Sequence, residues 1–287
     1  MPLDKKTPDS FGTVERLRAL ASTLPNAPGV YLFFGDNSTW PLYVGKSVDI
    51  RYRVLSHLRN AREARMMRQV RHIEGRRTAG EIGALLLEAS LIKRTQPLYN
   101  KQLRQNRDLC SLHIEQTHIE VVRARDVDFA RHPNLFGLFS SRSSALKSLR
   151  RIADDKQLCL ARLNLETTRP DGPCFRAMLR QCAGVCCGRE SPQQHDERLR
   201  LALKAMQIAC WPYAGAIAIV ERAEDQIQYH VVQNWYYLGT AVDIEGIADC
   251  VRTPAGFDAD GYKILCKPIL DGSKEILQIP APYCSET

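Results

Sequence analysis

The chain carries GVYLFF at residues 29–34 and, after a short polar segment, LYVGKS at residues 42–47. Each apolar run is typical of a short buried strand, and a glycine lies at one end of each run. The two runs together predict a β-hairpin whose cross-strand neighbours hold the phenols of Tyr31 and Tyr43 close to one another. Two phenols, the adjacent Lys46 and an arginine-rich segment that follows are suited to the hydrolysis of a phosphodiester.

Positive charge is concentrated in this part of the chain. Positions 1–110 hold 19 Lys and Arg against 10 Asp and Glu, a balance of +9, whereas positions 221–287 hold 5 against 11, a balance of −6. Residues 51–77 contain nine arginines and no lysine, opposed by Glu63 and Glu74. A guanidinium matches the geometry of phosphate better than an ammonium does. We therefore predict nucleic-acid contact rather than an ordinary solvated surface, through Arg51, Arg59, Arg62, Arg65, Arg68 and Arg71. About five such contacts predict a log–log salt slope of roughly −4 to −5.

Composition limits the class of protein. A hydrophobic content of 44% over 287 residues is sufficient for at least two compact domains. No run approaches the ~18 apolar residues of a membrane span, and Met1 to Ser10 contain no apolar stretch, so we expect a cytoplasmic protein with no membrane partner. Ten cysteines without a secretion signal argue against a disulfide framework and make clustered cysteines candidate metal ligands.

The apolar pattern predicts an α+β protein. The hairpin is followed by a helix near 49–71 with Asp49 as its N-cap, a helix near 80–94 and an extended tail. Further on, strands near 112–114 and 119–122 precede a helix near 143–153, and a charged helix near 193–208 precedes strands near 214–220 and 227–237. The boundaries we expect are 1–24 for an N-terminal extension, 25–107 for a first domain, 108–190 for a middle region with clustered cysteines, and 191–287 for a helix with a small, acidic, β-rich domain.

Glu88 lies on an apolar face of the helix predicted near 80–94. Its neighbours three and four positions away are Ala84, Leu85, Leu91 and Ile92. Burying a carboxylate without a partner is costly, so Glu88 requires one. Spacing alone leaves two partners open, namely one of the many arginines or a divalent cation. A single carboxylate completed by water and phosphate oxygens suits Mg²⁺ or Mn²⁺.

The two tripeptides GVY and YVG, with Lys46, Arg53, Glu88 and Tyr99-Asn100 at matching distances downstream, resemble the GIY-YIG nucleases. The segment LEASLIK at 87–93 is similar to the UvrC branch of that family, and weaker similarity runs through FGLF at 136–139 as far as Cys187. UvrC proteins are much longer and carry a second nuclease domain with helix-hairpin-helix elements. The chain therefore resembles the short UvrC homologues of the Cho type.

The resemblance implies a metal-dependent DNA endonuclease whose first domain is a short antiparallel sheet with flanking helices. It places Tyr43 as the general base for the attacking water, Tyr31 beside the scissile phosphate, Arg53 on the transition-state charge and Glu88 on Mg²⁺ or Mn²⁺. A free phenol has a pKa near ~10, so a basic role requires nearby positive charge, for which Lys46 and Arg53 are the candidates. Without the resemblance, a ring packed in the core is the commoner expectation for each of these strand tyrosines.

Two further positions belong to the predicted site. His57 stands where UvrC proteins often have tyrosine, which leaves open a hydrogen-bonding role near the site or a surface position. Asn100 is expected to fix the extended tail through hydrogen bonds, and its alternative is a turn residue after Tyr99.

Cys159, Cys174, Cys182 and Cys186 form the clustered group, with 14, 7 and 3 residues between successive members. The pattern is similar to the four cysteines of UvrC proteins, which are associated with an iron–sulfur cluster. Thiolates suit a [4Fe–4S] cluster or a structural Zn²⁺, and the spacing leaves both open beside a set of reduced, partly buried thiols. Cys187 is expected to be a bystander.

The resemblance favours a structure-directed DNA endonuclease of nucleotide excision repair that cuts beside a lesion in damaged double-stranded DNA loaded with UvrB, with UvrA acting upstream. One alternative is a GIY-YIG nuclease of mobile-element type with its own recognition module, which the acidic C-terminal part disfavours. The other is a non-catalytic, metal-cluster nucleic-acid-binding protein in which the hairpin tyrosines are core residues.

Overall fold

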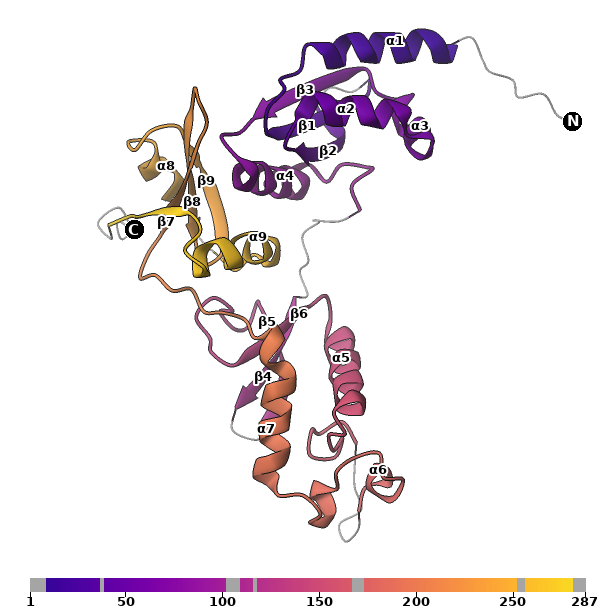
Figure 1. Cartoon of the computed structure of the whole chain (residues 1–287), viewed down its shortest axis with the longest axis vertical. Helices are drawn as coiled ribbons and strands as arrows, with labels where there is room; N and C mark the ends of the chain where they lie inside the picture. The colour runs from indigo at the N-terminus through magenta and orange to yellow at the C-terminus, as the bar shows by residue number, and fades with distance from the viewer. Residues whose placement is uncertain are drawn as a thin grey trace, which may run out of the picture. The chain divides into compact units, whose positions relative to one another are not determined.

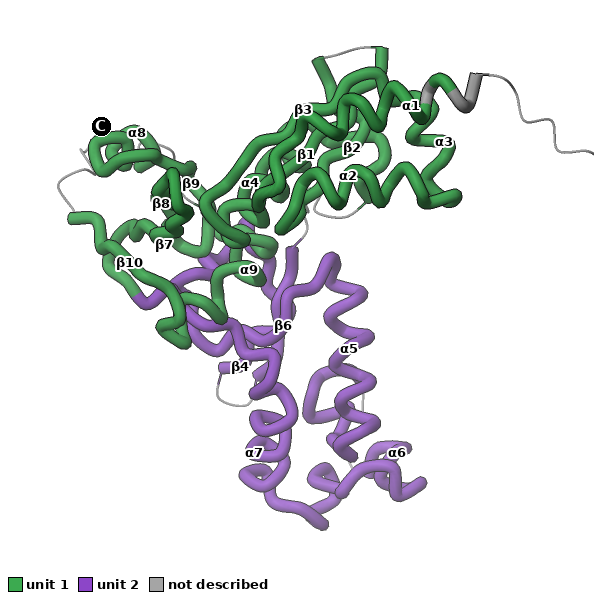
Figure 2. The backbone as a smooth tube through the Cα atoms, turned by 45° about the horizontal axis from the view of Figure 1, so that its top comes forward, with its two compact units in different colours: residues 1–105, 213–287 green, residues 106–212 purple. Residues whose placement is uncertain are grey.

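The computed structural model describes residues 9–36, 39–101, 109–115, 118–166, 173–251 and 256–280. The chain divides into two compact units, one made of residues 1–105 with 213–287 and the other of residues 106–212 (Figure 2). The first unit therefore combines the N-terminal and C-terminal parts of the chain. The fold is α+β, as predicted, with three antiparallel sheets among the described residues.

The N-terminal domain is built on the predicted hairpin. Strands β1 (Gly29–Phe34) and β2 (Pro41–Ser47) pair antiparallel, and β3 (His72–Arg77) joins the other side of β1, so the strand order is β2-β1-β3 (Figure 1). Because side chains alternate along a strand, β1 contributes to two cores. Tyr31 and Phe33 pack against α2 (Ile50–Arg59), whereas Leu32 and its neighbours pack against α4 (Glu81–Thr95).

The helix predicted near 49–71 is interrupted. Helix α2 ends at Arg59, and the 3₁₀ turn η1 (Ala61–Glu63) and helix α3 (Ala64–Met67) follow it. Asn60 adopts an extended backbone and its side chain accepts a hydrogen bond from the backbone N–H of Arg62, so this asparagine ends one helix and caps the next segment. The chain then forms β3, which the sequence analysis did not predict, and this strand carries two of the nine arginines, Arg76 and Arg77.

The segment expected to be a separate N-terminal extension belongs to the core of this domain. Helix α1 (Asp9–Ser22) buries Leu17 and Ala21 against the α2 face of the sheet, together with Leu24. The backbone carbonyl oxygens of Val70 and Arg71 accept hydrogen bonds from Arg16, which attaches α1 to the segment before β3. The domain therefore begins well before the predicted residue 25.

The C-terminal domain is a four-stranded sheet with two helices. Its strands are β7 (Ile217–Arg222), β8 (Ile227–Gln233), β9 (Tyr236–Ala241) and β10 (Glu275–Gln278), in the order β10-β7-β8-β9, with α8 (Ile247–Val251) and α9 (Ala259–Leu270). The strand predicted near 227–237 is two strands, because Asn234 and Trp235 both have positive φ and make a tight hairpin turn. Both helices were absent from the sequence prediction.

The second unit contains the sheet β5-β4-β6, formed by β4 (Cys110–Glu115), β5 (His118–Arg123) and β6 (Leu135–Phe139). Helix α5 (Arg142–Asp155), the short helix α6 (Phe175–Met178), the turn η2 (Val185–Cys187), helix α7 (Pro192–Leu203) and the turn η3 (Lys204–Met206) complete it. The boundary predicted at 190/191 is not where the structure divides. Leu199 and Leu203 of α7 enter the core that includes Leu112 and Leu149, so α7 belongs with the middle region. The boundary predicted at 107/108 lies outside the described residues.

The packing of α1 leads to a stability prediction. Leu17→Ala removes a side chain that is 1% exposed, so the free energy of unfolding should fall by about 2–4 kcal/mol. The matched control is the adjacent, exposed Arg18→Ala, which should change it by no more than about 0.5 kcal/mol. Denaturant unfolding followed by circular dichroism measures both, and equal small effects would contradict the assignment of α1 to the core.

Candidate active site and cysteine cluster

The hairpin brings the two predicted phenols together over a glycine. Tyr31 on β1 pairs in register with Gly45 on β2, and the Tyr31 and Tyr43 ring centroids are 6.1 Å apart. A Cβ at residue 45 would lie 2.4 Å from the Tyr31 Oη and 2.8 Å from the Tyr43 Cε1. Only glycine at residue 45 therefore lets both rings cover the strand at this point.

Tyr31 is held by a buried histidine. Its hydroxyl is 2.7 Å from His57 Nε2, and His57 Nδ1 contacts the Glu63 carboxylate. Burial lowers the pKa of His57, which favours the neutral ring, and raises the pKa of Tyr31, which keeps its phenol protonated. The neutral ring donates from Nδ1 to Glu63, so Nε2 accepts the hydrogen bond that the Tyr31 hydroxyl donates. His57 is 3% exposed, which removes the surface position from the two alternatives left by the sequence.

Arg53 supplies the positive charge beside the phenols. It lies exposed on α2, and hydrogen bonding to Tyr31, with the charges of Tyr31 and Tyr43, raises the pKa of the guanidinium. Burial is the largest effect on Tyr43 and raises the pKa of its phenol, while the charge of Arg53 acts in the opposite direction. The Glu88 carboxylate raises it further, so Tyr43 is within electrostatic reach of both Arg53 and Glu88.

Lys46 is placed differently from the expectation. Its ammonium forms an ion pair with Glu81 at 2.8 Å, so it is engaged by the first turn of α4 rather than by Tyr43. Its backbone N–H instead donates to Glu88 Oε1 at 2.9 Å. Lys46 therefore acts on the predicted metal ligand through its main chain, and Arg53 is the cation that lowers the pKa of Tyr43.

Glu88 occupies the middle of α4, half-buried next to β2. Among the described residues its carboxylate makes no ion pair with an arginine, and no hydrogen bond engages Oε2. Burial raises the pKa of this carboxyl, and the Lys46 N–H and the Lys46 charge oppose that shift. One half-buried carboxylate with an uncommitted oxygen is a donor set that fits a hard, oxygen-seeking divalent cation.

Asn100 braces strand β2 from outside the sheet. Its Oδ1 accepts the Val44 N–H at 2.9 Å and its Nδ2 donates to the Val44 carbonyl at 2.8 Å. The Tyr99 N–H bonds the Leu42 carbonyl at 3.0 Å. The tail therefore closes the edge of β2, and the alternative of a simple turn residue does not describe Asn100.

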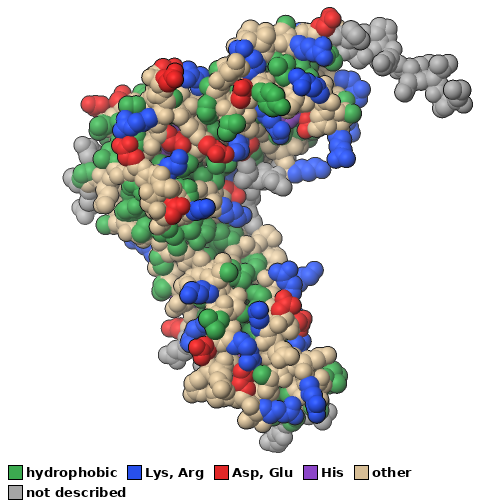
Figure 3. Space-filling view, in the orientation of Figure 1, with side chains coloured by type: hydrophobic (Ala, Val, Ile, Leu, Met, Phe, Trp, Pro, Cys, Tyr) green, Lys and Arg blue, Asp and Glu red, His purple; other side chains and the backbone are tan. Residues whose placement is uncertain are grey.

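The six predicted DNA-binding arginines fall into two groups. Arg51 donates to the Leu24 carbonyl at 2.7 Å, and Arg71 is bound to Asp36 and to the Arg68 carbonyl, so both have roles within the domain. Within the described part of the chain, the side chains of the other four make no hydrogen bond or ion pair, and all four are exposed. These four, which we call the open arginines, are Arg59, Arg62, Arg65 and Arg68. Figure 3 shows Lys and Arg side chains gathered where α2 and α3 lie.

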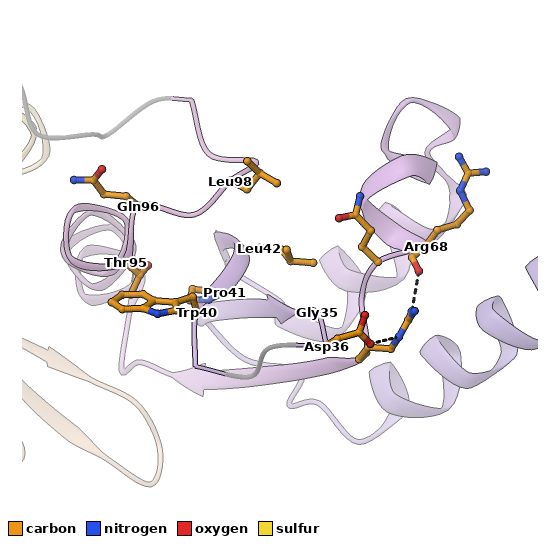
Figure 4. A pocket seen from close by; sticks show the side chains of 11 residues that line it. Gly35, Asp36, Trp40, Pro41, Leu42, Arg68, Thr95, Gln96 and Leu98 are labelled. Carbon is orange, nitrogen blue, oxygen red and sulfur yellow. Dashed lines mark hydrogen bonds and ion pairs between the residues drawn. The ribbon is translucent and has the colours of Figure 1, made fainter.

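An open groove of about 490 Å³ adjoins this surface. Figure 4 shows Trp40 and Leu98 on the side of the C-terminal end of α4, and Asp36 and Arg68 on the opposite side. Leu42, next to Tyr43 in β2, lies between them. The groove thus extends the exposed surface from the hairpin toward the open arginines.

The second unit brings the predicted cysteines together. The Cys174 Sγ is 3.9 Å from the Cys159 Sγ and 4.0 Å from the Cys182 Sγ, and all three residues are buried. The Cys186 Sγ accepts the Cys174 N–H at 3.4 Å and interacts with the Cys159 thiol. Cys187 turns away and donates to the Gly184 carbonyl. Three of the four predicted residues therefore form a compact group, and Cys186 lies beside it at the exposed side.

The surroundings of this cluster are ordered by polar side chains. His195 Nε2 accepts the Cys159 N–H at 3.1 Å, and Asp196 links His195 to Arg162. Burial, with the neighbouring thiols, raises the pKa of Cys159 to about 12. The sulfurs around a tetrahedral Zn²⁺ bound at about 2.3 Å lie about 3.8 Å apart, and the two separations measured from the Cys174 Sγ are close to this value.

Sequence reasoning missed three acidic residues near the site. Glu63 was counted only as a counter-charge to the arginines, yet it orients His57; Glu81 pairs with Lys46. Glu221 lies 138 residues beyond Gly83, whose N–H it accepts. The position of Glu63, three residues after the helix-ending Asn60, is a signal that could have indicated its role. The sequence contains no signal that would have indicated Glu221.

Among the described helices, none is long and apolar enough to cross a bilayer.

Comparison with known proteins agrees with this arrangement. Residues 27–101 match the model of the UvrC-like GIY-YIG domain, 109–205 the UvrC/Cho excinuclease middle domain, and 216–282 the excinuclease Cho C-terminal domain. Excinuclease Cho of Escherichia coli is 54% identical over 92% of this chain and 90% of its own length, and that of Salmonella typhimurium is 53% identical over the same shares. UvrABC system protein C of Geobacter metallireducens is 36% identical over 61% of this chain but 29% of its own length.

A solved structure, the GIY-YIG N-terminal endonuclease domain of UvrC from Thermotoga maritima bound to magnesium, is 32% identical. It covers 30% of this chain and 97% of that chain, with a TM-score of 0.28. The identity and coverage of the full-length relatives establish the family by themselves. The chain belongs to the excinuclease Cho family, endonucleases of nucleotide excision repair related to UvrC through their GIY-YIG domain.

Proposed function

We propose that this excinuclease hydrolyses one phosphodiester bond beside a lesion in damaged double-stranded DNA loaded with UvrB, with UvrA acting upstream. The observation that carries the catalytic part is the convergence of Tyr43, Arg53 and Glu88, because the Tyr43 phenol interacts with both charges. The partner assignment rests on family membership, since the related UvrC protein is named for the UvrABC system.

Hydrolysis of a phosphodiester requires an activated water and stabilisation of negative charge on the phosphate oxygens. Tyr43 removes a proton from the attacking water, and Tyr31, fixed by His57, orients the phosphate. Arg53 stabilises the charge that develops on the non-bridging oxygens. Glu88 would hold Mg²⁺ or Mn²⁺, which supplies Lewis-acid stabilisation when bound.

Lys46 and Asn100 position other parts of the site and do not react themselves. The Lys46 N–H occupies Glu88 Oε1 and leaves Oε2 available for the cation that Glu88 would hold, while Asn100 binds both backbone groups of Val44 in β2. The duplex lies on the open arginines, and Arg51 and Arg71 act within the domain. Neither alternative function is favoured by an observation, because residues 216–282 match the Cho C-terminal domain rather than a basic recognition module.

The decisive experiment uses a duplex with a single lesion, UvrA, UvrB and Mg²⁺. Tyr43→Phe and Glu88→Gln should each lower the nicking rate by about 10²–10⁴-fold while DNA binding persists. Tyr52→Phe, at an exposed tyrosine on α2, is the matched control and should cut at the wild-type rate. Nicking by none of the proteins would favour the binding module, and cutting of undamaged DNA without UvrA and UvrB would favour the mobile-element type.

The same reaction gives a pH dependence. The base must be deprotonated and burial raises the Tyr43 pKa, so the phenolate fraction increases with pH through the neutral and alkaline range. The wild-type rate should therefore fall about tenfold per unit as the pH decreases below that pKa. The residual activity of Tyr43→Phe should lack this dependence, and an identical profile in both proteins would exclude Tyr43 as the base.

The open arginines predict the salt dependence of DNA binding. Each phosphate contact contributes about −0.9 to the log–log slope, so replacing Arg59, Arg62, Arg65 and Arg68 together by alanine should make it less steep by roughly 3–4. Arg51→Ala, which removes a guanidinium bound to the Leu24 carbonyl, should leave the slope unchanged. Fluorescence anisotropy at several salt concentrations measures both, and equal slopes in all proteins would place the DNA elsewhere.

We further propose that the cysteine cluster holds one structural Zn²⁺, because its sulfur separations fit a single tetrahedral ion better than the wider spacing imposed by an iron–sulfur cube. Protein purified without oxygen should contain about one zinc per chain. Cys186→Ser should lower that content, and the adjacent Cys187→Ser should not. Iron with visible charge-transfer absorbance would contradict zinc and favour the [4Fe–4S] alternative.

A further inference from the structure

Helix α4, which carries Glu88, lacks a cap of its own. Gly80 occupies the N-cap position and offers no side chain, so the first backbone N–H groups of the helix need acceptors from elsewhere. Glu221 on β7 of the C-terminal domain supplies them. Its Oε1 accepts the Ile82 N–H at 3.1 Å and its Oε2 accepts the Gly83 N–H at 2.8 Å.

The Glu221 carboxylate is itself fixed from behind. Its Oε2 lies 3.1 Å from His230 Nε2 on β8, and Lys274 Nζ is 3.8 Å from Oε1. His230 is fully buried, and its Nδ1 is 2.8 Å from the Thr240 hydroxyl, which in turn contacts Tyr237 at 2.6 Å. Glu221 is therefore held by His230 and Lys274 on one side and by the N–H groups of α4 on the other.

Two glycines make room for this contact. A Cβ at residue 80 would lie 2.4 Å from Glu221 Oε1, and a Cβ at residue 83 would lie 2.5 Å from His230 Cε1. Gly83 is inside a helix, where glycine is usually less favourable than alanine by about 0.5–1 kcal/mol. Its presence is explained by the close approach of the C-terminal domain.

The C-terminal domain also holds the other end of α4. Lys93, in the last turn, forms ion pairs with Asp258 and Asp260 at the start of α9. Glu88 lies between the two attachments, five residues after Gly83, which corresponds to about 7.5 Å along the helix axis. A shift or rotation of α4 at its first turn therefore moves Glu88 directly.

We propose that Glu221 is a positioning residue of the nuclease, and that the C-terminal domain completes the active site by setting the position of α4. This rests on the proposed role of Glu88 as the cation ligand. A carboxylate that binds a metal has to be held to within about half an ångström of its productive position. The Glu221 cap at Ile82 and Gly83 attaches α4 to the C-terminal domain, and the Lys46 N–H attaches Glu88 to β2.

The test compares Glu221→Ala and Glu221→Gln with Asp225→Asn in the full-length chain. Asp225 forms an exposed bidentate pair with Arg77 between the same two domains, so its variant weakens the attachment without touching the cap. Three quantities are measured: hydrogen exchange at residues 82–88, Mn²⁺ affinity without DNA from the resonance signal of the free ion, and nicking rate against Mg²⁺ concentration.

Glu221→Ala should increase exchange in the first turns of α4 by about tenfold and raise both the Mn²⁺ dissociation constant and the Mg²⁺ midpoint by a similar factor. The rate at saturating Mg²⁺ should stay close to wild type, because excess cation repopulates the productive position. Glu221→Gln, which keeps one acceptor, should recover part of the effect, and Asp225→Asn should match wild type in metal affinity.

Faster exchange with an unchanged Mn²⁺ affinity and Mg²⁺ midpoint would overturn the proposal and leave Glu221 as a tether. Equal Mn²⁺ affinity of wild type and Glu88→Gln would instead show that the cation role of Glu88 is wrong, and the positioning proposal would fall with it. If Glu221→Ala does not fold, Gly83→Ala decides the same question. It should weaken Mn²⁺ binding, whereas Gly12→Ala, at a helical glycine with no neighbour within 4 Å, should not.

Discussion

The free edge of strand β2 is the constraint on which the catalytic domain depends. In the order β2-β1-β3, the outer backbone groups of β2 have no partner among the described strands, and unpaired polar groups at a buried edge are costly. Side chains and tail residues satisfy them instead. Glu88 accepts the Lys46 N–H, Asn100 binds both backbone groups of Val44, and Tyr99 donates to Leu42. Residues far apart in the sequence therefore meet at β2, because the backbone groups along its edge need hydrogen-bond partners.

The hydrogen bonds along this edge also place the ionisable groups of the proposed site. Glu88 lies against the edge of β2 at Lys46, and the preceding residue, Gly45, provides the space for the two phenol rings. Burial raises the pKa of both phenols and of the Glu88 carboxyl, because it disfavours the charged form of each group. Arg53 is the fixed charge that favours the anionic form of Tyr43. A bound cation and a phosphate would add the remaining positive and negative charges of the proposed site.

The acidity of the C-terminal domain has a structural explanation within the chain. Asp225 pairs with Arg77, Asp258 and Asp260 pair with Lys93, and Glu221 caps α4. These acids oppose basic or positively polarised groups of the catalytic domain. The opposite charges at the two ends of the chain therefore face each other in ion pairs, and the open arginines have no acidic partner among the described residues.

Local patterns in the chain were sufficient to predict the hairpin, its phenols, the helix that carries Glu88 and the grouping of the cysteines, because glycine-bounded apolar runs and residue spacing are local signals. The same patterns predicted a helix that continues past Asn60, and they did not indicate that α1 packs in the core of the catalytic domain. Other contacts became apparent only in the folded chain: Lys46 binds Glu81, His57 lies buried between Tyr31 and Glu63, and Glu221 caps α4. Most of these contacts join residues that are far apart in the sequence, and no repeating pattern marks them. They form because buried polar groups and backbone N–H groups need partners in the folded chain.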